Sequence, residues 1–250
     1  HVRRHGPAKV LLMEAKYGFL DIPPLCQIGA AYVSFQPTPR QFTGIKAFVF
    51  ALCMIPLGHL VQGIVTDGLG ANPIEAVTRG LGDWALRLLL LTLAVTPLRR
   101  LTGINWLLRL RRMLGLFTFF YATLHMLTYV WLDQFFAWDF ILRDIVKRPF
   151  ITVGFISFVL LIPLAVTSTT AMMKRLGRYW SRLHKAVYAI AILAVLHFWW
   201  MVKADVREPA LYAGMLAVLL GSRLVWWVRA RQSVRPRPER PKAYAAVRRA

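Results

Sequence analysis

The sequence is poor in charged residues and in cysteine. Only 17% of its 250 residues are charged, whereas 57% are hydrophobic, and a soluble domain of this length needs many more charges on its surface. Two cysteines, Cys26 and Cys53, and the lack of a Cys-x-x-Cys pair argue against a disulfide framework, an iron–sulfur cluster and a thiolate metal site. The patterns HExxH, GxSxG, the P-loop and zinc-ligand spacing are also missing, so none of these site classes is indicated.

Long apolar blocks take up most of the chain. At about 1.5 Å per residue, six of them can cross a hydrocarbon core of about 30 Å, the shorter ones with help from flanking residues. Three prolines, Pro56, Pro97 and Pro163, fall inside or near the ends of these blocks. Proline kinks a helix, and helix bundles in membranes tolerate such kinks. The sequence therefore predicts an all-α membrane protein, a bundle of six transmembrane helices. The predicted spans are 45–65, 82–98, 113–132, 150–167, 183–202 and 210–228.

The formal net charge is +21, and the basic residues lie in the gaps between apolar blocks and in the two tails. Loops that face an anionic cytoplasmic leaflet explain this pattern better than nucleic-acid binding, so a membrane lipid surface is expected and no nucleic-acid partner. The loops after the second and fourth spans carry arginine and lysine without any acid, whereas the loops after the first and third spans carry aspartate or glutamate. This alternation predicts that both termini lie in the cytoplasm.

The chain divides into three segments. Residues 1–44 have no sustained period and no apolar core followed by a cleavage site, so they are not predicted to be a signal peptide. We treat them as a doubtful N-terminal leader outside the fold, with a more natural beginning near Thr38. Residues 45–229 form the transmembrane domain, and residues 230–250 form a basic Pro/Arg-rich cytoplasmic tail. The sequence shows no internal repeat.

Two histidines fall at matching depths in the predicted bundle. His125 lies 12 residues beyond Met113, about 18 Å into its span, and His197 lies 13 residues beyond His184, about 20 Å along a span that runs the same way. An imidazole inside lipid needs a partner. Either each ring bonds a carbonyl or hydroxyl of a neighbouring helix, or the two rings ligate one heme iron from opposite faces. The matched depth favours heme ligation, with His125 and His197 as the axial ligands of the iron.

The other two histidines within the predicted spans are less specific. His184 sits at the basic edge of its span, and 13 residues at about 100° each place it some 140° around the helix from His197. It either contacts a second heme or another cofactor, or is solvated at the interface. His59 lies near the outer end of the first span beside Pro56 and Gly58, and we expect a structural role for it.

Several stretches resemble the MsrQ family, formerly YedZ. They include LRRMLGLFTFFYATLHMLTYVWLDQ, KRPFITVGF and LGRYWSRLHKAVYAIAILAVLHFWWMVK, and the resemblance covers roughly residues 38–230. It implies a ferric-reductase-like cytochrome b of the bacterial inner membrane that binds heme b and FMN. The heme histidines of the family match His125, His184 and His197 here, whereas His59 does not match the family pattern.

The resemblance also implies partners. Family members pass electrons from the quinone pool or a cytosolic flavin reductase to a periplasmic, molybdopterin-containing methionine sulfoxide reductase, which repairs oxidised periplasmic proteins. The expected function is therefore an electron-transfer subunit whose catalytic site lies on the partner subunit. A ferric or cupric reductase is the first alternative, but it needs a flavin and nicotinamide domain that the sequence does not contain. A heme-free membrane anchor or small transporter is the second.

Overall fold

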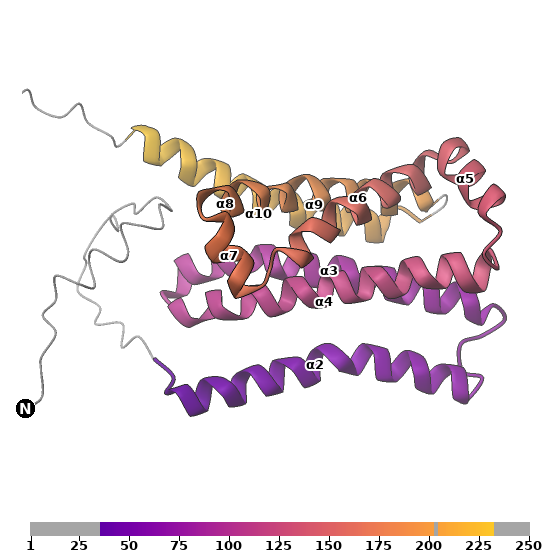
Figure 1. Cartoon of the computed structure of the whole chain (residues 1–250), viewed down its shortest axis with the longest axis horizontal. Helices are drawn as coiled ribbons and strands as arrows, with labels where there is room; N and C mark the ends of the chain where they lie inside the picture. The colour runs from indigo at the N-terminus through magenta and orange to yellow at the C-terminus, as the bar shows by residue number, and fades with distance from the viewer. Residues whose placement is uncertain (1–35, 203–204, 233–250) are drawn as a thin grey trace, which may run out of the picture.

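The computed structural model describes residues 36–202 and 205–232, and this part of the chain is built from helices without any strand. Six of the helical segments are long and apolar enough to cross a membrane, which confirms the predicted number of spans. Figure 1 shows them running side by side. The helices are α2 (Pro39–Val65), α3 (Pro73–Thr102), η2 (Asn105–Leu107), α4 (Leu108–Leu127), the π-helical η3 (Thr128–Asp133), α5 (Trp138–Lys147), α6 (Pro149–Val166), α7 (Thr170–Leu176), α8 (Arg178–Leu183), α9 (Ala186–Met201) and α10 (Arg207–Gln232).

The spanning helices extend beyond the apolar blocks because local capping signals, not hydropathy, set their ends. Thr38 caps α2 through a capping box with Gln41, so the helix begins inside the segment predicted to be a leader. Asn72 caps α3 and is followed by Pro73, and Gly103 ends this helix with a left-handed φ of 73°. The predicted leader before residue 36 and the tail after residue 232 lie outside the described residues.

The two ends of the bundle differ in charge. Every acidic residue of the described ranges lies in or near the loops after α2, η3 and α9, at what we call the acidic end. Helix α2 begins at the opposite end, the basic end, where the described residues carry arginine and lysine but no acid. The acidic residues are Asp67, Glu75, Asp83, Asp133, Asp139, Asp144, Asp205 and Glu208. This separation matches the alternation of the loops in the sequence.

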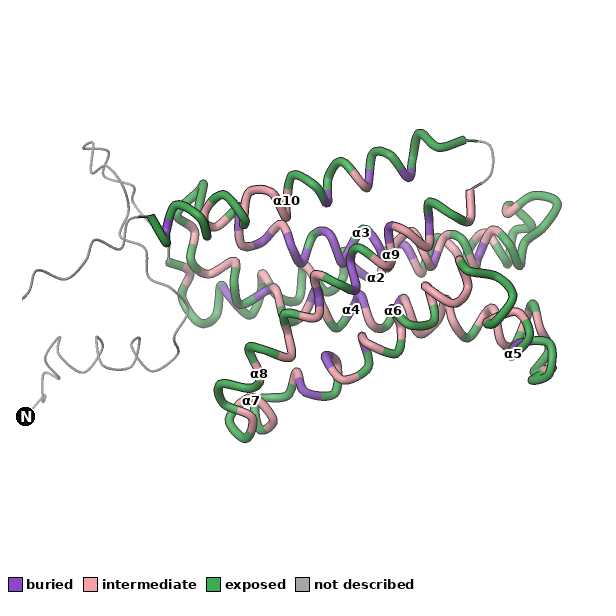
Figure 2. The backbone as a smooth tube through the Cα atoms, turned by 90° about the horizontal axis from the view of Figure 1, so that it is seen from above, coloured by how far each residue is buried: buried purple, intermediate pink, exposed green. Residues whose placement is uncertain are grey.

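Helix α3 lies at the centre of the bundle. In the most apolar 18-residue stretch of α3, 50% of the residues are buried inside the protein, compared with 11% in the corresponding stretches of α2 and α10. It packs along α4, while α6 packs along α9, and Figure 2 shows buried positions gathered along α3 and α9. The outward faces of α2 and α10 carry large apolar side chains, such as Phe48 (65% exposed) and Val218 (72% exposed), as helices do when their outer surface faces lipid.

Helix α2 is attached to the bundle at its proline. Pro56 cannot donate a backbone hydrogen bond, which loosens the helix around it. The hydroxyl of Tyr121, on α4, enters this loosened turn: it donates to the Cys53 carbonyl at 2.6 Å and accepts from the Leu57 N–H at 3.2 Å. Tyr121 is completely buried, and Cys53 is a buried free thiol, as expected for a small core residue.

Candidate functional site

The structure brings His125 and His197 together. The first comes from α4 and the second from α9, and their ring centroids lie 6.2 Å apart with an interplanar angle of 75°. A metal ion bonded to two imidazoles at about 2 Å each separates the ring centroids by roughly 6 Å. The observed spacing of the two rings therefore suits one iron held between them.

Each of the two rings is oriented by a backbone carbonyl. Nδ1 of His125 lies 2.8 Å from the Thr78 carbonyl oxygen, and Nδ1 of His197 lies 2.6 Å from the Phe150 carbonyl oxygen. A carbonyl only accepts, so Nδ1 carries the proton and donates it, which leaves the Nε2 lone pair free to bind a metal. The hydrogen bond to a backbone carbonyl, which we considered as the alternative to heme ligation, is therefore present in both cases. It occupies only one nitrogen of each ring and leaves the other free.

A glycine makes room for each ring. A Cβ atom at Gly154 would lie 2.7 Å from His197 Nδ1, and a Cβ atom at Gly82 would lie 3.1 Å from His125 Nδ1. Both distances are shorter than the 3.4 Å at which ordinary contact begins. Each imidazole can lie this close to the neighbouring helix because the position beneath it has no side chain.

These features occur twice in the chain. In each case the residue whose carbonyl accepts the hydrogen bond lies 47 residues before the histidine, and the glycine lies four residues after that residue. The equivalent positions (Thr78 and Phe150, Gly82 and Gly154, His125 and His197) are each 72 residues apart. The arrangement of carbonyl, glycine and histidine on α3–α4 thus recurs on α6–α9, a correspondence that the sequence analysis did not predict.

His184 lies apart from this pair, at the junction of α8 and α9. Its ring stacks on Trp180 with 4.0 Å between centroids, and its Nδ1 lies 3.1 Å from the Trp180 carbonyl oxygen. Its Nε2 is buried and has no hydrogen-bond partner within the described ranges. Arg223, on α10, is nearby in the same half of the bundle: it donates to the Tyr188 hydroxyl at 2.6 Å and to the Leu93 carbonyl at 2.5 Å.

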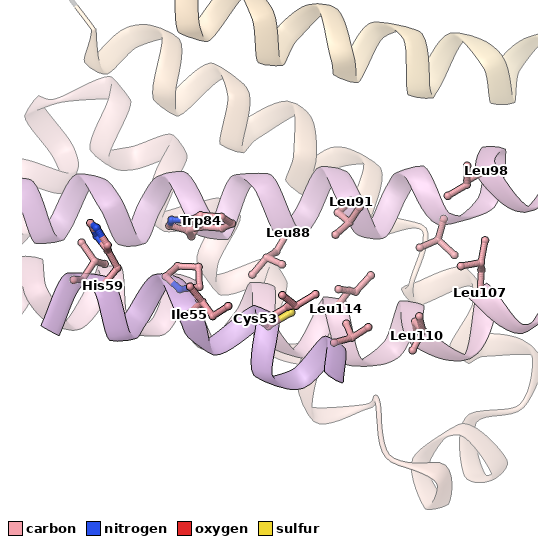
Figure 3. A pocket seen from close by; sticks show the side chains of 15 residues that line it. Cys53, Ile55, His59, Trp84, Leu88, Leu91, Leu98, Leu107, Leu110 and Leu114 are labelled. Atoms are coloured by element: carbon pink, nitrogen blue, oxygen red, sulfur yellow. The ribbon is translucent and has the colours of Figure 1, made fainter. Parts of the chain in front are cut away.

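His59 is exposed and lines a cavity between α2, α3 and α4, with Trp84 across from it (Figure 3).

No group of three or more His, Cys, Asp or Glu side chains suitable for a metal ion occurs in the described part of the chain. The facing pair of His125 and His197 offers two imidazole nitrogens, the number of protein ligands that a heme iron takes when the porphyrin provides the other four.

Sequence analysis missed the supporting residues of the pair. Gly82 and Gly154 each precede a histidine by 43 positions. This equal spacing between glycine and histidine was the signal in the sequence that could have identified the two glycines. The carbonyls of Thr78 and Phe150 left no signal, because any residue type provides one.

Known proteins share most of this chain. Residues 81–195 match the family described as the ferric reductase like transmembrane component. A protein of Herminiimonas arsenicoxydans is 55% identical over 197 residues, which cover 78% of this chain and 90% of the relative. One of Azospira oryzae is 56% identical over 199 residues (79% and 85%), and one of Xanthomonas campestris pv. campestris strain B100 is 61% identical over 161 residues (64% and 73%). All three are named protein-methionine-sulfoxide reductase heme-binding subunit MsrQ.

No solved structure matches the chain. The relatives confirm the resemblance found in the sequence. Together with the six spanning helices, they also confirm the predicted all-helical, ferric-reductase-like membrane fold and the location in a bacterial membrane.

Proposed function

The chain belongs to the MsrQ family of ferric-reductase-like transmembrane proteins, and we propose that it binds heme b between His125 and His197 and relays electrons across the membrane. The observation that carries this proposal is the facing pair of imidazoles on α4 and α9 at 6.2 Å. When bound, heme supplies a one-electron carrier whose potential depends on its axial ligands and surroundings.

The protein's own residues orient the ligands. The carbonyls of Thr78 and Phe150 fix the tautomer of each imidazole, so that Nε2 is the nitrogen presented to the iron and its basicity is raised. Gly82 and Gly154 let the rings lie against α3 and α6. The apolar bundle around the pair excludes water, and a low-dielectric surrounding of this kind is one of the features by which proteins set the potential of a heme.

We also infer the direction of transfer from the charge of the two ends. The basic end faces the cytoplasm under the positive-inside rule, which places both described termini there and the histidine pair in the half of the membrane nearer the periplasm. Electrons then enter from the quinone pool or a cytosolic flavin reductase. They leave towards a periplasmic, molybdopterin-containing subunit that reduces methionine sulfoxide in oxidised proteins.

His184 is the candidate for a second cofactor contact. Its buried Nε2 without a partner in the described ranges supports such a contact, since buried polar atoms are ordinarily satisfied. FMN, expected from the family resemblance, is proposed as a further cofactor, and we assign no residue to it.

The absorption spectrum of the purified protein tests the heme assignment. His125→Ala and His197→Ala are each expected to abolish the reduced-minus-oxidised heme spectrum while the protein still inserts into the membrane. His59→Ala is the matched control, because it removes a histidine that belongs to the α2 cavity, and it should leave the spectrum unchanged. Full heme content in both ligand variants would refute the assignment, and the heme-to-protein ratio of His184→Ala tests the second contact.

A further inference from the structure

Helix α2 encloses a large apolar cavity against α3 and α4. Its volume is about 730 Å³, and Figure 3 shows His59 and Trp84 at one end and Leu98 and Leu107 at the other. Several lining side chains, among them Ile55 (60% exposed) and Leu91 (49% exposed), are also open to the outside of the bundle. In a membrane this outside is lipid, so the cavity is a groove that opens sideways into the bilayer.

The groove is long enough to hold a lipid tail. Along α3 it runs from Trp84 to Leu98, 14 residues or about 21 Å at the helical rise. One leaflet contributes about half of a hydrocarbon core of about 30 Å. An acyl chain that enters from the basic end therefore fits lengthwise between α2 and α3, and the apolar side chains of the lining offer it contacts along its whole length.

Two cations from different helices meet at the basic end of this groove. Both contact the ring of Phe42: Lys46 Nζ lies 5.0 Å from the ring centroid, and Arg109 Cζ lies 5.1 Å from it. Lys46 is one helical turn before Val49, and Arg109 directly precedes Leu110. Both Val49 and Leu110 line the groove, so the two positive charges stand at its mouth.

Among the residues that the structure describes, no acidic side chain forms an ion pair with Lys46 or Arg109. The two ion pairs in the described ranges, Arg79–Glu75 and Arg148–Asp144, both lie at the acidic end. An anionic headgroup would supply the missing negative charge at the depth where lipid phosphates lie, and each basic residue near an anionic membrane surface contributes favourably to such binding.

We propose that this groove binds one anionic glycerophospholipid, with an acyl chain between α2 and α3–α4 and the phosphate against Lys46 and Arg109. The lipid completes the packing of α2, which the protein itself holds through contacts that include the Tyr121 hydroxyl at the Pro56 turn and the ring of Phe42 against Trp106, 6.5 Å between centroids. This site is independent of the histidine pair and of the heme assignment.

Native mass spectrometry of the full-length protein, with phosphatidylglycerol or phosphatidylcholine added, tests the proposal. Wild-type protein should retain phosphatidylglycerol in preference to phosphatidylcholine. The double variant Lys46→Gln with Arg109→Gln should bind phosphatidylglycerol about 10- to 30-fold more weakly, because two basic contacts are lost. The matched control, Lys174→Gln with Arg175→Gln on α7, removes the same charge at the same end of the bundle, away from the groove, and should bind normally.

A second variant tests the groove itself. Leu91→Trp fills the middle of the cavity and should lose the lipid while the helical content by circular dichroism stays unchanged. Equal weakening in both double variants, or equal retention of the two lipids, would show a general surface-charge effect and overturn the proposal. So would displacement of the bound lipid by a quinone whose binding depends on His59 and not on Lys46 or Arg109. Competition by inorganic phosphate alone would show an anion site without a lipid and would overturn it as well.

Discussion

Replacing Gly154 with alanine tests whether the close approach of His197 to α6 is needed for heme binding. The added Cβ would lie 2.7 Å from Nδ1, 2.9 Å from Cε1 and 3.1 Å from Cγ of His197. All three distances are below the 3.4 Å at which ordinary contact begins, so the ring must retreat by about 0.5–1 Å, since overpacked side chains relieve such clashes by shifting. The clash involves a ring held at 2.6 Å from the Phe150 carbonyl, so the helix backbone and the imidazole cannot both stay in place.

The expected cost has two parts. Overpacking of this kind typically destabilises a protein by about 1–3 kcal/mol. If the ring moves far enough to break its bond to Phe150, the imidazole also loses the partner that fixes its tautomer, and loss of such a partner lowers metal affinity about 10- to 100-fold. Gly154→Ala should therefore weaken heme binding by about 10- to 100-fold while the helices remain formed.

Titration of heme into the heme-depleted protein measures the heme affinity. The electron paramagnetic resonance signal of the ferric form reports whether the two imidazoles still ligate the iron. Gly82→Ala should show a smaller change of the same kind, because its Cβ would lie 3.1 Å from the nearest atoms of His125. Gly214→Ala and Gly221→Ala on α10 are the controls, since nothing lies within 4 Å of a Cβ at either position. Wild-type affinity and an unchanged low-spin signal in Gly154→Ala would refute the reasoning.

Three further predictions concern the bundle. Tyr121→Phe removes the hydroxyl that joins α4 to α2 and should lower stability by about 1–2 kcal/mol. The change should appear as a lower Tm and as faster hydrogen exchange in α2, and unchanged exchange in α2 would contradict this role of the hydroxyl. Arg223→Gln should lower stability by about 2–3 kcal/mol, because charged hydrogen bonds to α9 and α3 are lost. Arg231→Gln, which removes a cation–π contact with Trp227, should cost less than 1 kcal/mol. In a variant without native cysteines, Asp139→Cys should react with a membrane-impermeant thiol reagent in spheroplasts and Lys174→Cys should not; the reverse would invert the proposed orientation.

The sequence determined the number of spans and the charge of the two ends. Both follow from local properties, the length of each apolar block relative to the thickness of a bilayer and the type of charge in each loop. The equal depth of His125 and His197 is also local information, because a helix rises by a fixed amount per residue. Helix ends were less well predicted: α3 begins at Pro73 and not at residue 82, since a capped and charged turn outside the apolar block can still be helical.

The tertiary structure alone decided which faces of the helices meet. The depth of a histidine says nothing about the direction in which its ring points, and the 6.2 Å approach of the two imidazoles depends on how α4 and α9 pack against α3 and α6. The carbonyls that hold the rings, the glycines beneath them and the Tyr121 hydroxyl inside the Pro56 turn involve partners more than 40 residues away in the chain. Such contacts have no period in the sequence, because they arise only when separate helices come together.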